Sequence, residues 1–158
     1  MRFLLDVMCG GLVAYLRMCG HDTVYAGDRD LEADDALLAC ATAEDRTLVT
    51  RDVDLAARAD ESGSILLESL EVDDQLAELS NAGVDLTLAD EPRFCGRCNG
   101  RLEAVDRAAS SGAVETPEYA PAADETDVWR CRACGQFFWR GSHWERVERT
   151  LSRIDADG

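Results

Sequence analysis

Two pairs of cysteines have the spacing of a metal site. Cys95 and Cys98 enclose Gly-Arg, and Cys131 and Cys134 enclose Arg-Ala. Two thiolates separated by two residues can reach one ion from a single tight turn, and a second pair completes a tetrahedral shell at roughly 2.3 Å per Zn–S bond. Unrelated cysteines or disulfides are the alternative, which the repeated pairing disfavours. We therefore predict a structural zinc site, which indicates a scaffold rather than a reaction.

Four aspartates, Asp6, Asp34, Asp52 and Asp54, are the candidates for catalysis. Carboxylates that converge without lysine partners repel one another unless a divalent cation lies among them. Mg²⁺ or Mn²⁺ suits an oxygen shell with an open side for phosphate, and such a site can promote phosphodiester hydrolysis. In a chain with 32 acidic residues, helix caps and turns are the more frequent role of such aspartates on spacing alone.

Alternating apolar segments predict the elements that must position these side chains. Short strand patterns cover 3–5, 23–25, 47–50 and 65–67, and helical spacing covers 12–19, 34–41, 53–58 and 72–83. This alternation predicts an α/β fold with a parallel sheet covered by helices on both faces. Ligands bind such sheets at the carboxyl ends of the strands, where Asp6, Asp52 and Asp54 are expected. Asp34 is placed to cap a helix.

The pattern changes near residue 91, which predicts two domains. Residues 1–90 form the α/β domain, and residues 91–151 form a small zinc ribbon with a long irregular loop over 106–127. A strand is expected at 136–140, and Ser142 and Glu145 form a capping box that opens a last helix. Residues 152–158 are predicted to be a disordered tail. We expect zinc to fold the ribbon and the first domain to fold without it.

The charge of the chain is extreme. The net charge is -16, the pI is near 4.3, and every one of the 16 basic residues is arginine. This composition predicts a halophilic protein, because concentrated salt screens the repulsion between acidic groups. Residues 1–91 carry a net charge of -15 and residues 92–158 a net charge of -1. A solubility adaptation of this kind weakens the argument from acidity against a nucleic-acid partner.

Cysteine usage and hydropathy bear on the compartment. The chain opens without an apolar stretch long enough for a signal peptide or a membrane span. Cys9, Cys19 and Cys40 lie at apolar positions outside the two pairs, and an odd total of seven cysteines suits buried thiols. We therefore expect a cytoplasmic protein without a membrane partner.

Arginines and aromatic residues are interleaved in the second half. Nine arginines fall between residues 93 and 149, among the aromatic residues at 137–139 and 144. This pattern is typical of an RNA-docking surface, or of a small aromatic core whose arginines pair with local acids. The candidate RNA contacts are Arg17, Arg51, Arg97 and Arg140, with salt bridges as the alternative for the first two. His143 is expected to form hydrogen bonds or to pack rather than to bind zinc, and His21 is expected to face solvent.

Longer strings resemble a known family. In the first half they are Phe-Leu-Leu-Asp at 3–6, the stretch 11–25, Asp-Asp-Ala-Leu-Leu at 34–38 and Leu-Val-Thr-Arg-Asp at 48–52. In the second half they are 95–102, 131–135 and Trp-Arg-Gly-Ser-His-Trp at 139–144. Together these are similar to the Mut-seven C-terminal RNase domain family, a PIN-like ribonuclease domain with a C-terminal zinc ribbon. The Thr-Arg-Asp and Trp-Arg-Gly-Ser-His-Trp strings are the specific ones.

The resemblance implies a PIN-like metal-dependent ribonuclease that cleaves the phosphodiester bonds of RNA by in-line hydrolysis, with the ribbon aiding RNA docking. It assigns Asp6, Asp34 and Asp52 to a Mg²⁺ or Mn²⁺ ion, with Asp54 assisting and Asp35 as an alternative to Asp34. A non-catalytic RNA- or protein-binding module on the same scaffold is the competing hypothesis. The RNA substrate, endonuclease or exonuclease action, protein partners and the oligomeric state stay open.

Overall fold

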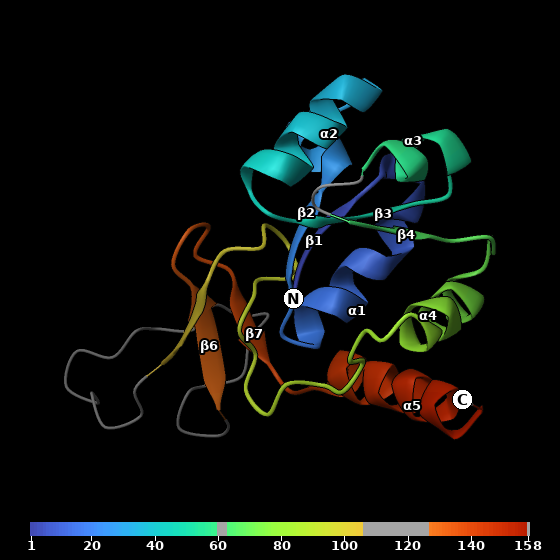
Figure 1. The fold of residues 1–158 in the computed structure, drawn as a ribbon. Helices are drawn as coiled ribbons and strands as arrows, with labels where there is room; N and C mark the ends of the chain where they lie inside the picture. Colours follow the sequence, from blue (N-terminus) through green and yellow to red (C-terminus); the bar gives the residue numbers. More distant parts are fainter. Residues whose placement is uncertain (60–62, 106–126, 158) are drawn as a thin grey trace.

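A computed structural model describes residues 1–59, 63–105 and 127–157 (Figure 1). The elements are β1 (Arg2–Leu5), η1 (Val7–Leu12), α1 (Val13–Met18), β2 (Asp22–Tyr25), η2 (Ala26–Arg29), α2 (Asp34–Ala43), β3 (Thr47–Thr50), α3 (Val53–Arg58), β4 (Ser64–Leu66), α4 (Val72–Asn81), β5 (Leu102–Ala104), β6 (Val128–Cys131), β7 (Phe137–Trp139) and α5 (Ser142–Asp157). The loop predicted between the cysteine pairs falls almost entirely on residues 106–126, outside the described residues.

The four predicted strands of the first half form one parallel sheet in the order β2-β1-β3-β4. Leu4 of β1 is in register with Val24 of β2 and with Leu48 of β3. A second, antiparallel sheet has the order β5-β6-β7. The predicted α/β class is confirmed, and the sequence patterns missed the short strands β5 and β6.

Helices cover both faces of the parallel sheet because the side chains of its strands alternate (Figure 1). Phe3 and Leu5 lie in a core that also contains buried residues of η1, α1 and α4. Leu4 lies in the other core, together with Leu37 of α2 and Leu55 of α3. Within the described residues, none of these helices combines the length and the apolar composition needed to cross a lipid bilayer.

Helix α5 follows the ribbon in sequence but packs on the first domain (Figure 1). Its residues Val147 and Leu151 are buried in the same core as Leu76 and Leu79 of α4. The tail predicted to be disordered from residue 152 is instead the end of α5, which runs to Asp157. Helix α5, which the sequence patterns assigned to the ribbon, therefore belongs to the hydrophobic core of the first domain.

The ribbon also docks on the edge strand β2 through polar contacts. Arg17 of α1 donates from Nε to the carbonyl oxygen of Thr23 at 3.0 Å and from Nη1 to that of Gly96 at 2.9 Å. Asn99 accepts from the Thr23 N–H at 2.9 Å and donates to Asp22 at 2.7 Å. Arg17 is 2% exposed, so its predicted role as an RNA contact is not supported. It links the two parts of the chain.

His21 contradicts its predicted exposure. The side chain is buried against Phe3, with ring centroids 5.3 Å apart. Its Nε2 lies 2.7 Å from the carbonyl oxygen of Asp85, and its Nδ1 lies 3.2 Å from the N-terminal nitrogen. Burial lowers the pKa of His21.

Candidate functional site

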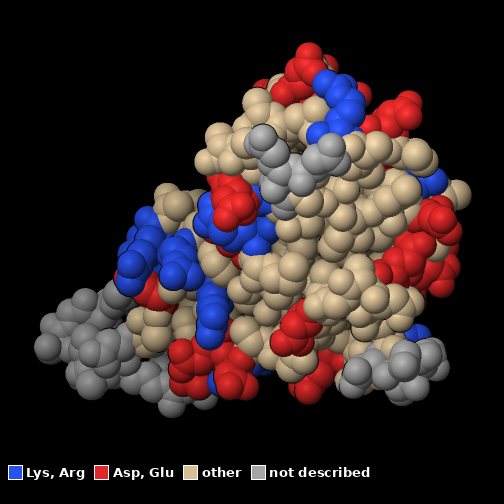
Figure 2. Space-filling model, in the orientation of Figure 1, with Lys and Arg blue, Asp and Glu red and all other residues tan. Residues whose placement is uncertain are grey.

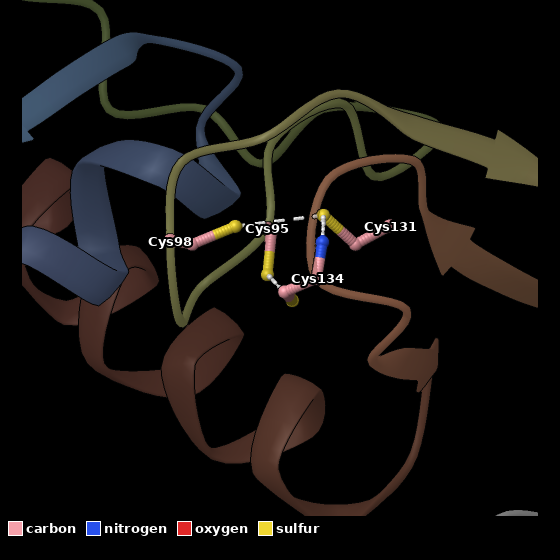
Figure 3. Close-up of side chains that lie close together, drawn as sticks. All are labelled: Cys95, Cys98, Cys131 and Cys134. Atoms are coloured by element: carbon pink, nitrogen blue, oxygen red, sulfur yellow. Dashed lines mark hydrogen bonds between the residues drawn. The ribbon is translucent and has the colours of Figure 1, made fainter.

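The four paired cysteines converge as predicted (Figure 3). Their sulfur atoms all lie within 4.8 Å of one another, with 3.5 Å between Cys98 and Cys131 and 3.7 Å between Cys95 and Cys134. A tetrahedral ion with bonds of roughly 2.3 Å would separate its sulfur ligands by about 3.8 Å. The donor set and its spacing therefore fit a structural zinc ion.

Backbone amides support these sulfur atoms. The N–H of Arg97 points to Cys95 Sγ at 3.3 Å, and those of Ala133 and Cys134 point to Cys131 Sγ at 3.4 Å. Burial raises the pKa of the Cys95 thiol to about 12, so this ligand becomes a thiolate when a cation offsets its desolvation. Hydrogen bonds from Cys134 and Ala133, acting against burial, lower the pKa of Cys131 to about 7. The two ligands thus differ in the pKa of their thiols, and a bound cation would favour the thiolate form of both.

Gly100 is predicted to be essential for zinc affinity. A Cβ atom at this position would lie 2.7 Å from Cys131 Sγ and 2.8 Å from Ala133 Cβ. At Gly96, in the same turn, a Cβ atom would meet nothing closer than Phe138 at 3.8 Å. We expect Gly100→Ala to weaken zinc binding by roughly 10- to 100-fold, the range for positions that orient metal ligands. Competition with a chelator measures the zinc affinity. The matched control is Gly96→Ala, which should change the zinc affinity by less than about threefold.

The other predicted ligand-type residues lie apart from this group. His143 is exposed and does not belong to the four-residue cluster. Cys9 and Cys19 are buried as predicted, and burial raises the pKa of each thiol to about 12. Cys40 is partly buried and donates to Glu44 at 3.2 Å. These three cysteines are free thiols in packed or polar surroundings.

A second candidate site lies at the carboxyl ends of β1 and β3, where Thr50 joins two aspartates. Its hydroxyl donates to Asp6 Oδ2 at 2.7 Å and accepts from the N–H of Asp52 at 3.0 Å. Asp6 follows β1 and is 6% exposed, and its other oxygen accepts from the N–H of Val7 at 2.7 Å. Asp52 caps α3 through one oxygen, which accepts from Asp54 and Leu55 at 3.0 and 3.2 Å.

The remaining aspartates do not join this pair at ligand distance. Asp34 is the first residue of α2 and not its cap, which is Ala33. Arg58, at the carboxyl end of α3, forms ion pairs with Asp34 and Asp35, whereas Asp52 caps the amino end of the same helix. In the described ranges, one group of three or more His, Cys, Asp or Glu side chains is placed to hold a metal ion. It is the four cysteines, whose sulfur atoms lie within 4.8 Å of one another. The predicted convergence of three aspartates is therefore absent from this structure.

Arg51 lies between Thr50 and Asp52 in the loop that opens this site. Its Nε atom is buried and has no hydrogen-bond partner among the described residues. Arg51 and Asp6 both act electrostatically on the buried Cys9 thiol, Asp6 raising its pKa and Arg51 lowering it. A buried N–H group without a partner is costly, so the local structure holds this side chain at an energetic cost.

The hydroxyl of Thr50 is predicted to hold the site together. Thr50→Val keeps the volume but leaves Asp6 Oδ2 and the Asp52 N–H without their partner. We expect it to destabilise the protein by about 1–3 kcal/mol, the usual cost of unsatisfied buried polar groups. Thr50→Ser keeps the hydroxyl and loses one methyl group, which should cost about 0.8 kcal/mol. Urea unfolding compares the two, and a larger loss for serine than for valine would contradict this role.

Two predicted RNA contacts in the ribbon have different surroundings. Arg140 donates to the carbonyl oxygen of Asp90 at 3.2 Å, pairs with Asp127 at 3.2 Å and stacks on Trp129. Arg97 is exposed and donates to Gln136 at 3.3 Å. Arg140 is thus occupied by intramolecular contacts, and Arg97 remains the more accessible of the two.

The fold and the two sites together define the class of protein: an α/β domain with a polar edge, followed by a ribbon whose four cysteines fit a zinc ion. The family model described as the Mut7-C RNAse domain matches residues 1–151, and the chain belongs to this family. Membership suggests a ribonuclease-type function. Neither the curated proteins nor the solved structures gave a significant match.

Thr50, Asn99 and Gly100 make contacts at the candidate sites and at the junction of the ribbon, and the sequence patterns did not single them out. Thr50 stands in the Thr-Arg-Asp string, and its polar side chain at the end of a buried strand was a usable signal. Asn99 has φ +66°, and an Asn-Gly pair directly after a metal-binding turn is a recognised signal for that left-handed conformation. Their partners, however, lie far away in sequence.

Proposed function

We propose that the chain is a Mg²⁺- or Mn²⁺-dependent ribonuclease of PIN-like type whose site is the Asp6, Thr50 and Asp52 edge of the sheet. The observation that carries this proposal is the Thr50 hydroxyl, which joins a buried and a partly exposed aspartate across adjacent parallel strands. Mg²⁺ is commonly held by one or two carboxylates together with water and substrate phosphates. Asp6 and Asp52 therefore suffice as ligands, with Asp54 assisting, and Asp34, which pairs with Arg58 at the other end of α3, is not part of this site.

The residues of this edge have distinct tasks in in-line hydrolysis. Asp6 and the uncapped oxygen of Asp52 would hold the cation, which supplies charge stabilisation and activation of water when bound. Thr50 orients the Asp6 carboxylate and holds the backbone N–H of Asp52. Arg51, which is partly exposed in the loop between Thr50 and Asp52, would contact the phosphate of the RNA. The zinc ribbon aids docking, with Arg97 as an accessible contact.

The proposal is tested by incubating the zinc-loaded protein with single-stranded RNA at high salt. We expect cleavage when Mn²⁺ or Mg²⁺ is added and none when no free divalent ion is present. The zinc content is measured before and after each reaction, so that loss of the ribbon is not mistaken for loss of the catalytic ion. Cleavage that persists at full rate without added Mn²⁺ or Mg²⁺ would refute the assigned chemistry.

A second candidate function is a non-catalytic module that binds a protein. Four exposed apolar side chains follow the strands at this same edge: Val7 and Met8, each 46% exposed, Val53, 66% exposed, and Leu70, 73% exposed. Apolar residues gathered around a polar centre are typical of protein contacts. Titration of the zinc-loaded protein with Mn²⁺ discriminates the two functions, because the ribonuclease must bind a divalent ion in addition to the zinc and the binding module need not.

A further inference from the structure

Arginines without acidic partners gather at the junction of the ribbon and the first domain. Figure 2 shows blue atoms concentrated over the ribbon and its junction, in contrast to the acidic rims of the α/β domain. Two hollows of about 580 and 610 Å³ adjoin there and share Arg93 and Arg101 in their walls. Both side chains are exposed, and neither forms an ion pair within the described part of the chain.

The hairpin that carries the first cysteine pair fixes these two arginines. Phe94 and Arg101 form an antiparallel bridge, and the N–H of Leu102 donates to the carbonyl oxygen of Arg93 at 3.0 Å. The Arg101 guanidinium lies over the Phe94 ring at 5.2 Å from its centroid. The hairpin tip is the cysteine turn, so bound zinc would fix the backbone that carries both arginines. An anion in the hollow that both residues line would be attracted by each of them.

The two hollows differ in their charge. The 610 Å³ hollow also contains Asp90 and Glu91, whose carboxylates offset its arginines. In the 580 Å³ hollow the acid is Asp22, which is already bonded to Arg2, Arg46 and Asn99. The smaller hollow is therefore the more cationic, and it is the better anion site.

We propose that the hollow between Arg93 and Arg101 binds the phosphate backbone of single-stranded RNA. Guanidinium groups bind phosphate oxygens in a bidentate manner, and the Arg101 and Phe94 pair offers a flat face to a base. The choice of RNA rests on the proposed function, and the charge argument stands on the structure. An acidic peptide would satisfy the charges but would not use the stacking face.

This hollow lies at the opposite end of the sheet from the proposed catalytic edge. Met1 and Asp22 line it at the amino ends of β1 and β2, whereas Asp6 and Asp52 follow the carboxyl ends of β1 and β3. A four-residue strand spans roughly 13 Å. RNA that occupies both places must therefore extend over about four nucleotides at the ~3.4 Å rise of a stacked strand. The hollow binds a segment that flanks the cleaved bond.

The test measures RNA affinity in the Asp6→Asn background, so that cleavage plays no part. We expect Arg93→Gln with Arg101→Gln to weaken binding of a 12-nucleotide single strand by about tenfold or more. The slope of log affinity against log salt should become shallower by about 0.7 for each phosphate that the variant no longer neutralises. The matched control is Arg146→Gln with Arg149→Gln on α5, which removes the same charge from arginines outside the hollow.

Several outcomes would overturn the inference. Equal losses in the two double variants would show that net charge alone matters. An acidic peptide that binds the hollow while RNA does not would identify a protein partner instead.

In the cleaving protein, the Arg93 and Arg101 variant should raise KM for the long RNA and leave kcat unchanged. It should not affect substrates too short to reach both ends of the sheet, and a kcat loss on these would place the arginines in the catalytic site. A protein that binds RNA as expected but never cleaves it would refute the proposed function and leave this site standing.

Discussion

Asp6→Asn is expected to reduce RNA cleavage by about 100-fold or more while the fold is retained. The substitution removes the charge of the one buried carboxylate at the edge of the sheet, and losses of this size follow removal of a single electrostatic catalytic group. The amide can still accept from the N–H of Val7 and donate to the Thr50 hydroxyl, so the local hydrogen bonds survive. Single-turnover cleavage at saturating Mn²⁺ measures the effect.

The matched control for this variant is Asp45→Asn. Asp45 is an exposed aspartate in the turn before β3, at the other end of the sheet, and its φ of +53° suits asparagine. It removes the same charge and should leave the rate within about twofold of wild type, as expected for an exposed charge that is remote from the site. If both variants lose activity equally, the effect reflects net charge, and Asp6 has no special role.

Loss of zinc is expected to destabilise both halves of the protein. Cys98→Ser removes one of the four ligands, and we expect a decrease in the free energy of unfolding of about 4 kcal/mol or more, because metal binding is coupled to folding. The ribbon holds the Thr23 amide through Asn99, and α5 contributes Val147 and Leu151 to the core of the first domain. Unfolding should therefore remain a single transition, and exchange of the Thr23 amide with solvent should accelerate.

Cys40→Ser serves as the control for that experiment. Cys40 is a thiol on α2 that contacts Glu44 and lies outside the zinc cluster. Its substitution should shift the free energy of unfolding by less than about 1 kcal/mol. Two separate transitions in Cys98→Ser, with the Thr23 amide as protected as in wild type, would show that the halves are independent.

Local patterns sufficed for much of the architecture. Alternating short apolar runs and helical spacing predicted the parallel sheet, and the repeated two-residue spacing predicted the convergence of Cys95, Cys98, Cys131 and Cys134. Both signals arise from neighbouring residues. The return of α5 to the first core did not follow from them, because Val147 and Leu151 would show the same helical spacing whichever surface they covered.

The candidate active site was predicted less completely, for the same physical reason. Asp6 and Asp52 follow buried strands, and the rule for parallel sheets placed them correctly at one edge. Asp34 begins a helix, and the direction of its side chain depends on Arg58, which lies 24 residues away. The inward position of His21 and the linking role of Arg17 likewise depend on partners that are distant in sequence.

The most direct test of the proposed catalytic centre is a crystal structure of the zinc-loaded protein soaked in Mn²⁺, with anomalous scattering used to locate the ions. We predict a zinc peak among the four cysteines and a Mn²⁺ peak within bonding distance of carboxylate oxygens of Asp6 and Asp52, the latter lost in Asp6→Asn. A structure with the zinc peak and no manganese at these aspartates would contradict the proposed catalytic centre.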